Sequence, residues 1–525
     1  MEMLLLVAYL AAGTVLYGVL LAIYRLTLHP LARFPGPKLA AATGWYEFYY
    51  NIVKMGTFIY KVDEMHKRYG RIVRINPHEI VINDAEFYNQ IYNMRPAEKW
   101  TLQTSGIGID GKIYYPMKEN SAHVVTTNHE LHRHRRKPLD PFFSRRGIER
   151  IEPVIVDEVK LLNDRLQSYS GTGHVIRLDH VFAAFAGDIV MEICTQRRPA
   201  MLENPEFGKE WNNLMLNGTK QSVLFLHFPL LNRVVRRIPT ALLLRLAPSA
   251  ATFNLLHQHA IKHIVDVKRD ITHQSSSNKD KDTTGSRLLR LDTSVFRSIL
   301  SPTSGLPPPE RNTERLAREA MALFGAGTLT TAHTLNMICY YLLANRAMGD
   351  RLRGELAPVM AGFPESKLAS WQELERLPYL HAVVREGLRL SYGVMHRLPR
   401  VFSTPTQYKE WTIPAGTPIG IGAYSLHSDP DVYSDPFSFT PERWLGDAVD
   451  PRLHRNWVTF SRGSRSCLGL NLAYAELYWA LAVLFRPGAP KLSLFETVEE
   501  DVKHVLDLSN ALPRWGSLGT RVTVG

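Results

Sequence analysis

The sequence predicts a mainly α-helical protein with a minor β region, preceded by one transmembrane helix. Three observations support this class. The N-terminus carries an uncharged apolar run, the periodicity from His129 to Leu390 is mostly helical, and short alternating segments surround Pro77 and recur from Arg397 to Pro418. With 525 residues, of which 45% are hydrophobic, the chain can bury one large core.

The apolar run extends from Met3 to Tyr24 without a charge. At about 1.5 Å per residue, such a helix crosses a hydrocarbon layer of about 30 Å. A cleaved signal peptide would have a shorter apolar part preceded by basic residues, whereas here the basic residues follow: Arg25, Arg33 and Lys38. The run therefore predicts a membrane anchor with the rest of the chain on the cytosolic side.

The domain boundaries follow from this anchor and from the prolines behind it. Residues 1–25 are expected to form the anchor, and residues 26–40 a stiff hinge, because His29-Pro30 and Pro35-Gly36-Pro37 disfavour a helix there. Residues 41–525 are expected to form one domain.

Charge and cysteine usage exclude several classes of protein. The three cysteines, Cys194, Cys339 and Cys467, are far apart and form no CxxC pair, so a disulfide framework or a zinc site is not expected. A reducing compartment fits this usage best. The net charge of +12 indicates an acidic partner or an anionic membrane surface. We expect no nucleic acid, since no basic run alternates with aromatic residues.

Along the chain, Gly70 to Asn83 predicts two short strands and a turn. The helical region is interrupted by polar or proline-rich stretches at 268–286 and 301–309, which predict surface loops. A further helix is expected from about Asn471 to Phe485.

The run from Phe460 to Gly469, FSRGSRSCLG, is the most informative segment. Its glycines let the backbone approach a flat ligand, Arg465 can donate a forked charge to a carboxylate, and Phe460 can cover the sulfur of Cys467. The alternative is a buried structural cysteine beside a turn. Five specified residue types at this spacing arise by chance on the order of once in ten thousand chains of this length.

This run resembles the haem loop of the cytochrome P450 family, in which a cysteine thiolate binds the haem iron. The resemblance implies haem b (iron protoporphyrin IX) as cofactor, Cys467 as the axial iron ligand, and the P450 fold over residues 41–525. In the same family, Pro441-Glu442-Arg443-Trp444 matches the PERW element. Arg443 is then expected to join Glu386 and Arg389, which lie three apart on one helix face, in a structural network.

The helical stretch from Glu319 to Leu343 contains a run of small residues after Phe324, namely Gly325-Ala326-Gly327-Thr328. Glycines inside a helix indicate either close approach of a ligand or close helix packing. In P450s this helix crosses the distal haem face, and the residue that matches the proton-delivering threonine is Thr330. The family usually has an acid just before this threonine, whereas this chain has Leu329.

The segment His129 to Arg136 is rich in histidine, but its first two histidines are three apart, whereas a zinc-binding HExxH needs four. By resemblance it is the helix that reaches the haem propionates, with His132 at a tryptophan position and Arg136 at an arginine position. Arg397 matches another propionate-facing arginine, the alternative being a plain surface charge. Together with Arg465, these residues are expected to neutralise the propionates.

The segment Gly106 to Gly111 matches GxGxxG, but no βαβ unit surrounds it, so a loop over the active site is the better interpretation. Electrons are therefore expected from a partner. The resemblance implies an NADPH–cytochrome P450 reductase, with NADPH acting only through it, and cytochrome b5 as a second candidate partner.

Together with the anchor, the resemblance implies a haem-thiolate monooxygenase of the endoplasmic reticulum membrane that hydroxylates or epoxidises an apolar small molecule. The segments HPLARFPGPKLAA and HRHRRKPLDPFFS and the Cys467 loop resemble those of microsomal P450s of filamentous fungi, many of which act on terpenoids or polyketides. This resemblance implies a terpenoid or polyketide intermediate of a secondary-metabolite pathway as substrate. Two alternatives stay open. Leu329 motivates a P450-fold isomerase, dehydratase or peroxide-driven oxygenase, and a haem sensor or carrier is the second.

Overall fold

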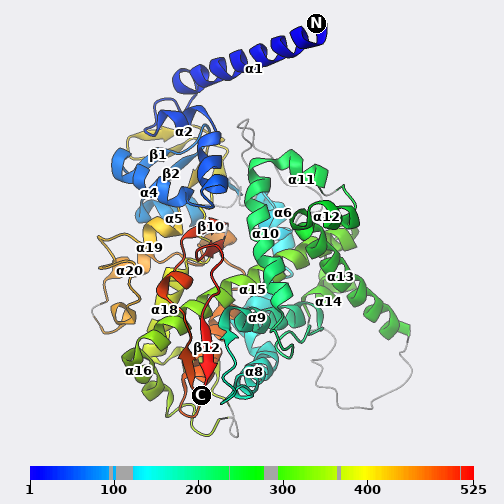
Figure 1. Ribbon diagram of the computed structural model, residues 1–525, viewed down its shortest axis with the longest axis vertical. Coiled ribbons are helices and arrows are strands. Elements are labelled where there is room, and N and C mark those ends of the chain that lie inside the picture. The colour runs from blue at the N-terminus through cyan, green and yellow to red at the C-terminus, as the bar shows by residue number, and fades with distance from the viewer. Residues whose placement is uncertain are drawn as a thin grey trace.

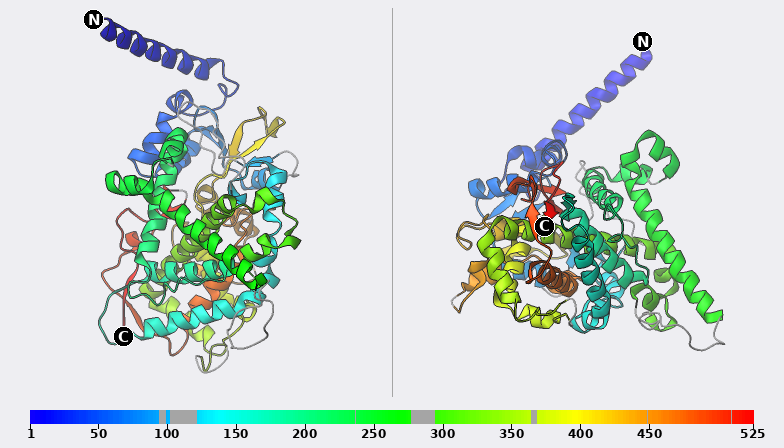
Figure 2. Two further views of the ribbon diagram at one scale, coloured as in Figure 1. Left: turned by 90° about the vertical axis from the view of Figure 1, so that its right-hand side faces the viewer. Right: turned by 60° about the horizontal axis from the view of Figure 1, so that its bottom comes forward.

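In the computed structural model, one helix stands apart from a large helical body (Figure 1). This helix, α1 (Glu2–Thr27), is the one helix in the described part of the chain that is long and apolar enough to cross a membrane. The structure describes residues 1–93, 99–101, 122–235, 237–276, 294–363, 368–447, 449–508 and 510–525. The Gly106 to Gly111 motif lies outside the described residues. In two turned views α1 again projects from one end of the body, and the C-terminus lies on the body (Figure 2).

The segment behind α1 is attached to the body along its length. Arg25 is buried and its Nη1 donates to the carbonyl oxygen of Ala42 over 2.9 Å. Leu31 and Phe34 are buried as well, and the backbone N–H of Arg74 donates to the carbonyl of Pro35 over 2.7 Å. The proline-rich segment thus packs against the body and does not swing freely.

Helices make up most of the body. Those of the first half are α2 (Lys38–Ala42), α3 (Trp45–Phe48), α4 (Phe58–Tyr69), α5 (Ala85–Asn93), α6 (His129–Arg136), α7 (Asp140–Phe143), α8 (Arg145–Gln167), α9 (Leu178–Thr195), α10 (Lys209–His227), α11 (Pro229–Val235), α12 (Thr240–Leu246) and α13 (Thr252–Ser276). Those of the second half are α14 (Val295–Leu300), α15 (Thr313–Ala344), α16 (Arg346–Leu356), α17 (Trp371–Glu375), α18 (Pro378–Ser391), α19 (Ala423–His427), α20 (Pro451–Asn456) and α21 (Leu470–Phe485).

Short helical turns connect these helices. One π-helical turn spans Tyr49–Val53, and 3₁₀ turns span His123–Val125, Pro248–Ala251, Pro302–Ser304, Pro308–Arg311, Pro441–Trp444, Gly463–Arg465 and Glu499–Asp501. The predicted helix after Cys467 is confirmed as α21. The prediction of a surface loop at 268–286 is wrong for residues 268–276, because α13 continues to Ser276. Lys268 there donates its Nζ to the hydroxyl of Thr313 over 2.8 Å, so tertiary contact outweighs the polar composition.

The β region is small, as the sequence predicts. A five-stranded sheet has the order β1 (Ile72–Arg74), β2 (Ile80–Ile82), β8 (Pro418–Gly420), β5 (Arg400–Phe402), β3 (Lys99–Thr101). The predicted hairpin is confirmed, since Val73 pairs with Val81 in antiparallel register. The smaller sheets pair β4 (Ile176–Arg177), β12 (Arg521–Val524) and β9 (Leu492–Leu494), then β6 (Thr406–Tyr408) with β7 (Trp411–Ile413), and β10 (Leu506–Leu508) with β11 (Asn510–Leu512).

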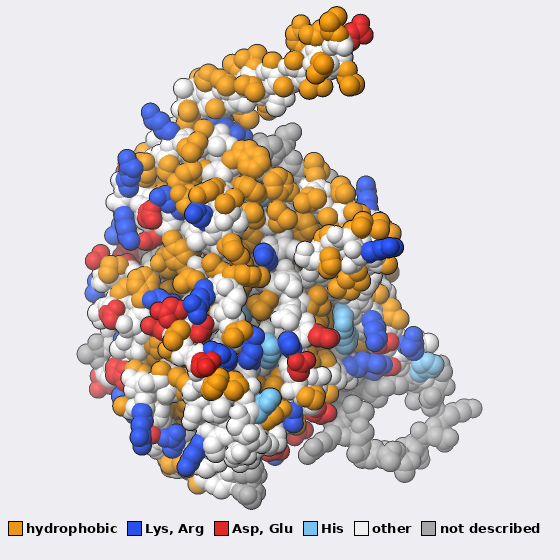
Figure 3. All heavy atoms as spheres, in the orientation of Figure 1, with side chains coloured by type: hydrophobic (Ala, Val, Ile, Leu, Met, Phe, Trp, Pro, Cys, Tyr) orange, Lys and Arg blue, Asp and Glu red, His pale blue; other side chains and the backbone are white. Residues whose placement is uncertain are grey.

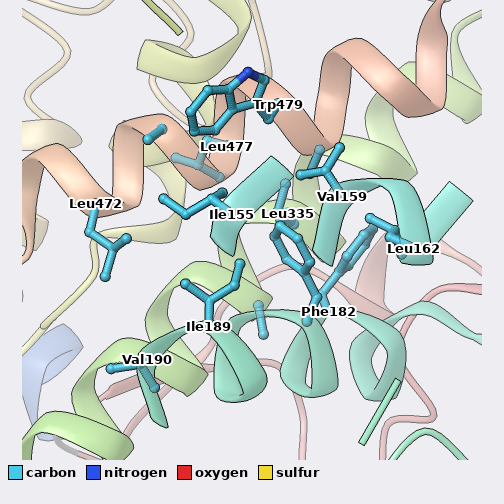
Figure 4. Close-up of a cluster of buried hydrophobic side chains, with 14 of the residues drawn as sticks. Ile155, Val159, Leu162, Phe182, Ile189, Val190, Leu335, Leu472, Leu477 and Trp479 are labelled. Carbon is cyan, nitrogen blue, oxygen red and sulfur yellow. The ribbon is translucent and has the colours of Figure 1, made fainter. Parts of the chain in front are cut away.

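The main core lies where α8, α9, α15 and α21 meet (Figure 4). On α8 the buried residues recur every three or four positions, as an amphipathic helix requires, whereas α9 and α21 are buried on nearly all sides. Val190 of α9 and Leu472 of α21 belong to this core and also line the cavity described next. The rigid core thereby fixes one wall of the site.

Candidate active site

One cavity brings together most of the residues that the sequence singles out. Its apolar wall comes largely from α9 and α15: Val190, Ala322, Leu323, Ala326 and Gly327. Its lining also includes Cys467 and the neighbours Phe460, Arg465, Ser466, Leu468 and Gly469. His132, Arg136 and Thr330 also line the cavity, so it joins apolar, cationic and thiol surfaces.

The loop that carries Cys467 is fixed by backbone contacts. The N–H of Cys467 donates to the carbonyl of Phe460 over 2.8 Å. Gly463 has φ +74°, and a Cβ there would come within 2.2 Å of the carbonyl oxygen of Tyr92. Glycine at 463 is therefore required by the approach of α5, which differs from the expectation that it makes room for a ligand.

The Cys467 thiol is exposed to the cavity, whereas Cys194 and Cys339 are buried in the core. Burial raises the pKa of Cys467, against the opposing effects of a hydrogen bond from the Gly469 backbone and of the Arg136 charge. α21 begins at Leu470, shortly after Cys467 in the chain, and the positive end of a helix favours a nearby thiolate. These contacts suit a sulfur that binds a metal cation from one side.

Two arginines line the cavity beside this loop. Arg136 donates its Nη1 to the carbonyl of Ser466 over 2.6 Å and its Nε to Asp140 over 2.9 Å. Arg465 donates to the carbonyls of Thr126 and Thr127, and its Nε has no partner in the described part of the chain. Burial lowers the pKa of Arg465 to about 9, with a further contribution from neighbouring arginine charges.

His132 is buried next to these arginines and lines the same cavity. Burial lowers its pKa to about 2, assisted by the charge of Arg465. Its Nδ1 has no hydrogen-bond partner among the described residues. His132 therefore faces the cavity as a neutral imidazole that can donate or accept a hydrogen bond, which differs from the cationic role expected of it.

The middle of α15 presents two adjacent threonines to the cavity, Thr330 and Thr331. The hydroxyl of Thr330 donates to the carbonyl of Ala326 in its own helix over 2.8 Å. Leu329 points elsewhere: it is buried in a cluster with Met215 and Leu256 and does not line the cavity. The side chain that precedes Thr330 thus belongs to the helix packing.

Gly325 and Gly327 of α15 differ in how closely neighbouring side chains approach them. A Cβ on Gly327 would come within 2.8 Å of Val190 Cγ2, so this glycine allows α9 to pack closely. At Gly325 the nearest atom to an added Cβ is Met215 Sδ at 3.8 Å. Close helix packing, one of the two interpretations of the sequence, accounts for Gly327.

Glu386 lies in α18, which also contributes Leu388 to the cavity lining, and it is the centre of a buried charge network. Arg389 donates Nη2 and Nε to its two carboxylate oxygens over 2.7 and 2.9 Å, and Arg443 donates Nε over 3.0 Å. Trp444 Nε1 adds a fourth donor at 2.8 Å. The structure therefore brings together the three residues that the sequence expects in this network.

The family model described as cytochrome P450 matches residues 42–487. The chain belongs to the cytochrome P450 family. The Cys467 loop, the long helix α15 and the Glu386 network all lie within the matched residues.

Relatives of this P450 come from fungi. The chain is 50% identical to the cytochrome P450 monooxygenase vrcB of Aspergillus aculeatus, with 98% of each chain covered. It is 46% identical to stellatic acid synthase of Emericella variicolor, covering 97% of this chain and 93% of that one. It is 43% identical to fusicoccadiene C-8 hydroxylase of Phomopsis amygdali, covering 96% and 93%. These relatives support an oxidoreductase of the monooxygenase type in fungal secondary metabolism.

The family implies haem iron, and the residues present fit that group. A sulfur faces the cavity, and cationic or neutral nitrogen donors with unmet hydrogen bonds lie beside it, as the propionates of haem require. Cys467 would hold the iron, and Arg136, Arg465 and His132 would hold the propionates.

Arg397 differs from the expectation that it faces a propionate. It is buried, so it is no surface charge, but it does not line the cavity. Its Nε donates to Glu79 over 2.7 Å and its Nη2 to Glu47 over 2.5 Å. Although burial alone would raise it, the Arg397 charge lowers the pKa of Glu47 to about 2. Arg397 therefore ties the β1–β2 region to the chain after α18.

Arg400, three residues further on, is a cation that the sequence analysis missed. It is 1% exposed, and its Nε and Nη2 have no partner among the described residues. Its Nη1 donates to the carbonyl of Leu398, which lines the cavity, and its charge lowers the pKa of Arg465. The position of Arg400 in the sequence could have identified it as a candidate, because it follows Arg397 by three residues. Arg400 begins strand β5, which places it beside the loop of Arg465.

Proposed function

We propose that this P450 inserts one oxygen atom into an apolar small molecule, by hydroxylation or epoxidation, and that the molecule is a terpenoid intermediate of a fungal secondary-metabolite pathway. The observation that carries the proposal is the cavity, whose lining combines Cys467 with apolar residues of α9 and α15. The name of the relative that hydroxylates fusicoccadiene supports a hydrocarbon substrate.

Haem held at Cys467 supplies the centre at which O₂ is reduced, with the thiolate favouring O–O cleavage. Overall, the substrate, O₂, two electrons and two protons yield the oxygenated product and water. The chain's own residues position the substrate and move the protons. Val190, Leu323 and Ala326 offer only apolar surface, so they hold a hydrocarbon and exclude water from it.

Thr330 is proposed to hold a water molecule in the cavity for proton transfer. Its hydroxyl already donates to Ala326, so the lone pairs of its oxygen remain free to accept a hydrogen bond from water. Thr330→Ala is expected to divert electrons into hydrogen peroxide and to lower the product formed per NADPH.

Electrons are proposed to come from an NADPH–cytochrome P450 reductase, with cytochrome b5 as a second donor, at the endoplasmic reticulum membrane. α1 would anchor the protein, with the body in the cytosol. Hydrophobic side chains gather on the end of the body nearest α1 (Figure 3). They include exposed residues of α11 and α12, which the bilayer surface would cover: Leu230, Leu231, Val234, Leu242, Leu244 and Leu246.

The test supplies microsomes that contain this chain and a reductase with fusicoccadiene and related terpene hydrocarbons under ¹⁸O₂. We expect a product with one ¹⁸O atom whose formation requires NADPH. Conversion without any electron donor would instead establish an isomerase, a dehydratase or, with added peroxide, a peroxide-driven oxygenase. Absence of turnover with every hydrocarbon would overturn the proposed substrate class.

A further inference from the structure

One imidazole in the cavity lining is held by a buried carboxylate. His123 is buried, and it lines the cavity together with the apolar residues of α9 and α15. Its Nδ1 lies 2.5 Å from Oε1 of Glu319, and its backbone N–H donates to Oε2 over 3.1 Å. Two contacts to one carboxylate therefore fix the position of the ring.

The Glu319 carboxylate is ionised, which decides the direction of this hydrogen bond. Although burial alone would raise it, the charge of Arg315 and the contacts with His123 lower the pKa of Glu319 to about 2. A carboxylate only accepts hydrogen bonds, so Nδ1 of His123 carries the proton and donates it. Nε2 is then the ring nitrogen that remains for a ligand, and no hydrogen bond to it is found among the described residues.

The charges behind Glu319 are balanced without the imidazole. Arg315 Nη2 lies 2.8 Å from Glu319 Oε2, and its Nε donates to Glu310 over 3.0 Å. Arg135 donates Nε and Nη2 to the two Glu310 oxygens, each over 2.8 Å. Two buried arginines and two buried carboxylates thus neutralise one another. The backbone N–H of residue 123 reaches Glu319 with any side chain, so neither charge balance nor this contact requires histidine there.

The position of Glu319 shows where along the cavity the imidazole lies. Four residues recur every three or four positions on one face of α15: Glu319, Leu323, Ala326 and Thr330. At about 1.5 Å per residue, Glu319 lies about 16 Å along the helix from Thr330. The two apolar residues between them line the cavity. His123 is therefore held towards the opposite end of this apolar wall from Thr330.

We propose that Nε2 of His123 binds a hydroxyl group of the substrate, so that the preferred substrate is a terpenoid that already carries one oxygen. This inference rests on the proposed monooxygenase function and narrows its substrate class from terpenoids to terpenoid alcohols. The hydroxyl group is held near Glu319, away from the carbon that is oxidised beside Thr330. A hydroxylation or a hydration of the terpene skeleton must then precede this reaction.

A hydroxyl group suits this nitrogen in either state of the ring. The neutral imidazole accepts a hydrogen bond at Nε2, and the protonated imidazole donates one there. A hydroxyl group can both donate and accept, whereas a ketone only accepts and a hydrocarbon offers neither. Because the ring is buried, a bound hydrocarbon would leave Nε2 without a partner, which costs free energy. The cavity should therefore favour the alcohol.

A second histidine of the cavity provides the matched control. Nδ1 of His396 lies 3.2 Å from Oδ2 of Asp507, so this ring is also paired with a carboxylate, and it also lines the cavity. Its side chain is 26% exposed, against 7% for His123, so water can satisfy its second nitrogen. His396→Phe thus removes a similar imidazole whose partner in the absence of ligand is solvent.

The first measurement is the Kd of matched ligand pairs on the haem-loaded protein without turnover, from the shift of the Soret band on titration. The probes are cedrene with cedrol, abietadiene with abietadienol, and fusicoccadiene with its C-8 alcohol. Native protein should bind the alcohol about three- to tenfold more tightly than the hydrocarbon in at least one pair. His123→Phe should bind both members of that pair equally, His123→Gln should retain part of the preference, and His396→Phe should keep it.

Equal affinity for alcohol and hydrocarbon in every pair of the native protein would overturn the inference. A preference that survives in His123→Phe, or that disappears in His396→Phe, would do the same. The rings of His123 and His132 lie 5.9 Å apart, so the rate of haem transfer to an excess of globin is a second readout. This rate should not change in His123→Phe. Faster haem loss with an unchanged alcohol preference would show that His123 holds the cofactor instead.

The second measurement is the regiochemistry of oxidation with a reductase. Native protein should place the new oxygen on a carbon remote from the hydroxyl group of the preferred alcohol, and His123→Phe should give a mixture of positions. Oxidation by the native protein at the carbon that already bears the hydroxyl group would contradict the location of the binding site at His123.

His123→Leu and His123→Gln keep the inference testable if His123→Phe fails to bind haem, because the backbone contact with Glu319 persists in each. Oxygenation of hydrocarbons by the native protein without any preference for alcohols refutes this inference alone. Lack of an oxygenated product from every hydrocarbon refutes the proposed function instead, so the two failures are distinguishable.

Discussion

Two buried charge clusters of this P450 differ in how their charges are met. At Glu386, one carboxylate accepts hydrogen bonds from Arg389, Arg443 and Trp444 within the fold. Beside the cavity, Arg400 and Arg465 have no carboxylate partner among the described residues, and each retains N–H groups without an acceptor. The carboxylate of the first cluster is therefore paired within the protein, whereas the guanidinium groups of the second cluster keep N–H donors that have no acceptor among the described residues.

This difference distinguishes a charge cluster that stabilises the fold from one that is suited to bind a ligand. A buried charge is tolerated where opposite charge and hydrogen bonds surround it, and it is costly elsewhere. The Glu386 cluster therefore stabilises the region before the Cys467 loop. The cationic cluster around Arg465 costs free energy on its own, and an anionic ligand such as the haem propionates would offset that cost.

The largest expected effect is at Glu386. Glu386→Gln leaves two buried guanidinium groups without their counter-charge, so the free energy of unfolding should fall by about 3–5 kcal/mol. Denaturant titration of the detergent-solubilised protein measures it. As the control, Glu442→Gln breaks the exposed pair with Arg351 in the same region and should cost about 1 kcal/mol or less. Equal losses in the two variants would contradict the account.

The next effect is at Arg400. Arg400→Met should leave the free energy of unfolding nearly unchanged but speed haem transfer to an excess of a haem-accepting globin about tenfold, because one charge-assisted hydrogen bond of about 1.5–3 kcal/mol is lost. Arg397→Met is the contrast, since it leaves Glu47 and Glu79 without their cation and should chiefly reduce stability. If Arg400→Met holds haem as long as the native protein, Arg400 does not contact the cofactor.

The smallest effect is the pH dependence at Glu476, a buried acid of α21 that lines the cavity and belongs to neither cluster. Its folded pKa of about 8 lies above the ordinary 4.5, so the folded protein binds the proton more tightly than the unfolded chain. Its contribution to stability is therefore complete below pH 4.5 and is lost as the pH rises through 8. From pH 6 to pH 7, the native protein should lose about 1 kcal/mol of stability relative to Glu476→Gln. A constant difference between the two proteins across this range would contradict the raised pKa.

The sequence predicted the helices and strands whose formation depends on residues close together in the chain. The hairpin at Val73 and Val81, the helix after Cys467 and the apolar N-terminal helix α1 were all expected. The end of α13 was missed because Lys268 gains a tertiary partner that composition does not reveal.

At the site, the sequence failed to predict roles that depend on which side chains pair with one another in the fold. The motif around Arg397 and Arg400 gives both arginines, but only the fold shows that Glu47 and Glu79 bind Arg397 and that Arg400 is left beside Arg465. The hydrogen bond between Thr331 and Glu476 likewise joins residues of two helices far apart in the chain. Such pairings between distant segments cannot be read from local spacing.

The most direct test of the central claim, that this cavity holds haem through Cys467, is the carbon monoxide difference spectrum of the reduced protein. Native protein and Cys339→Ala, which removes a buried core cysteine, should both show the red-shifted Soret band of a thiolate-bound haem. Cys467→Ala should lose this band and all turnover. Persistence of the red-shifted band in Cys467→Ala would show that another residue binds the iron.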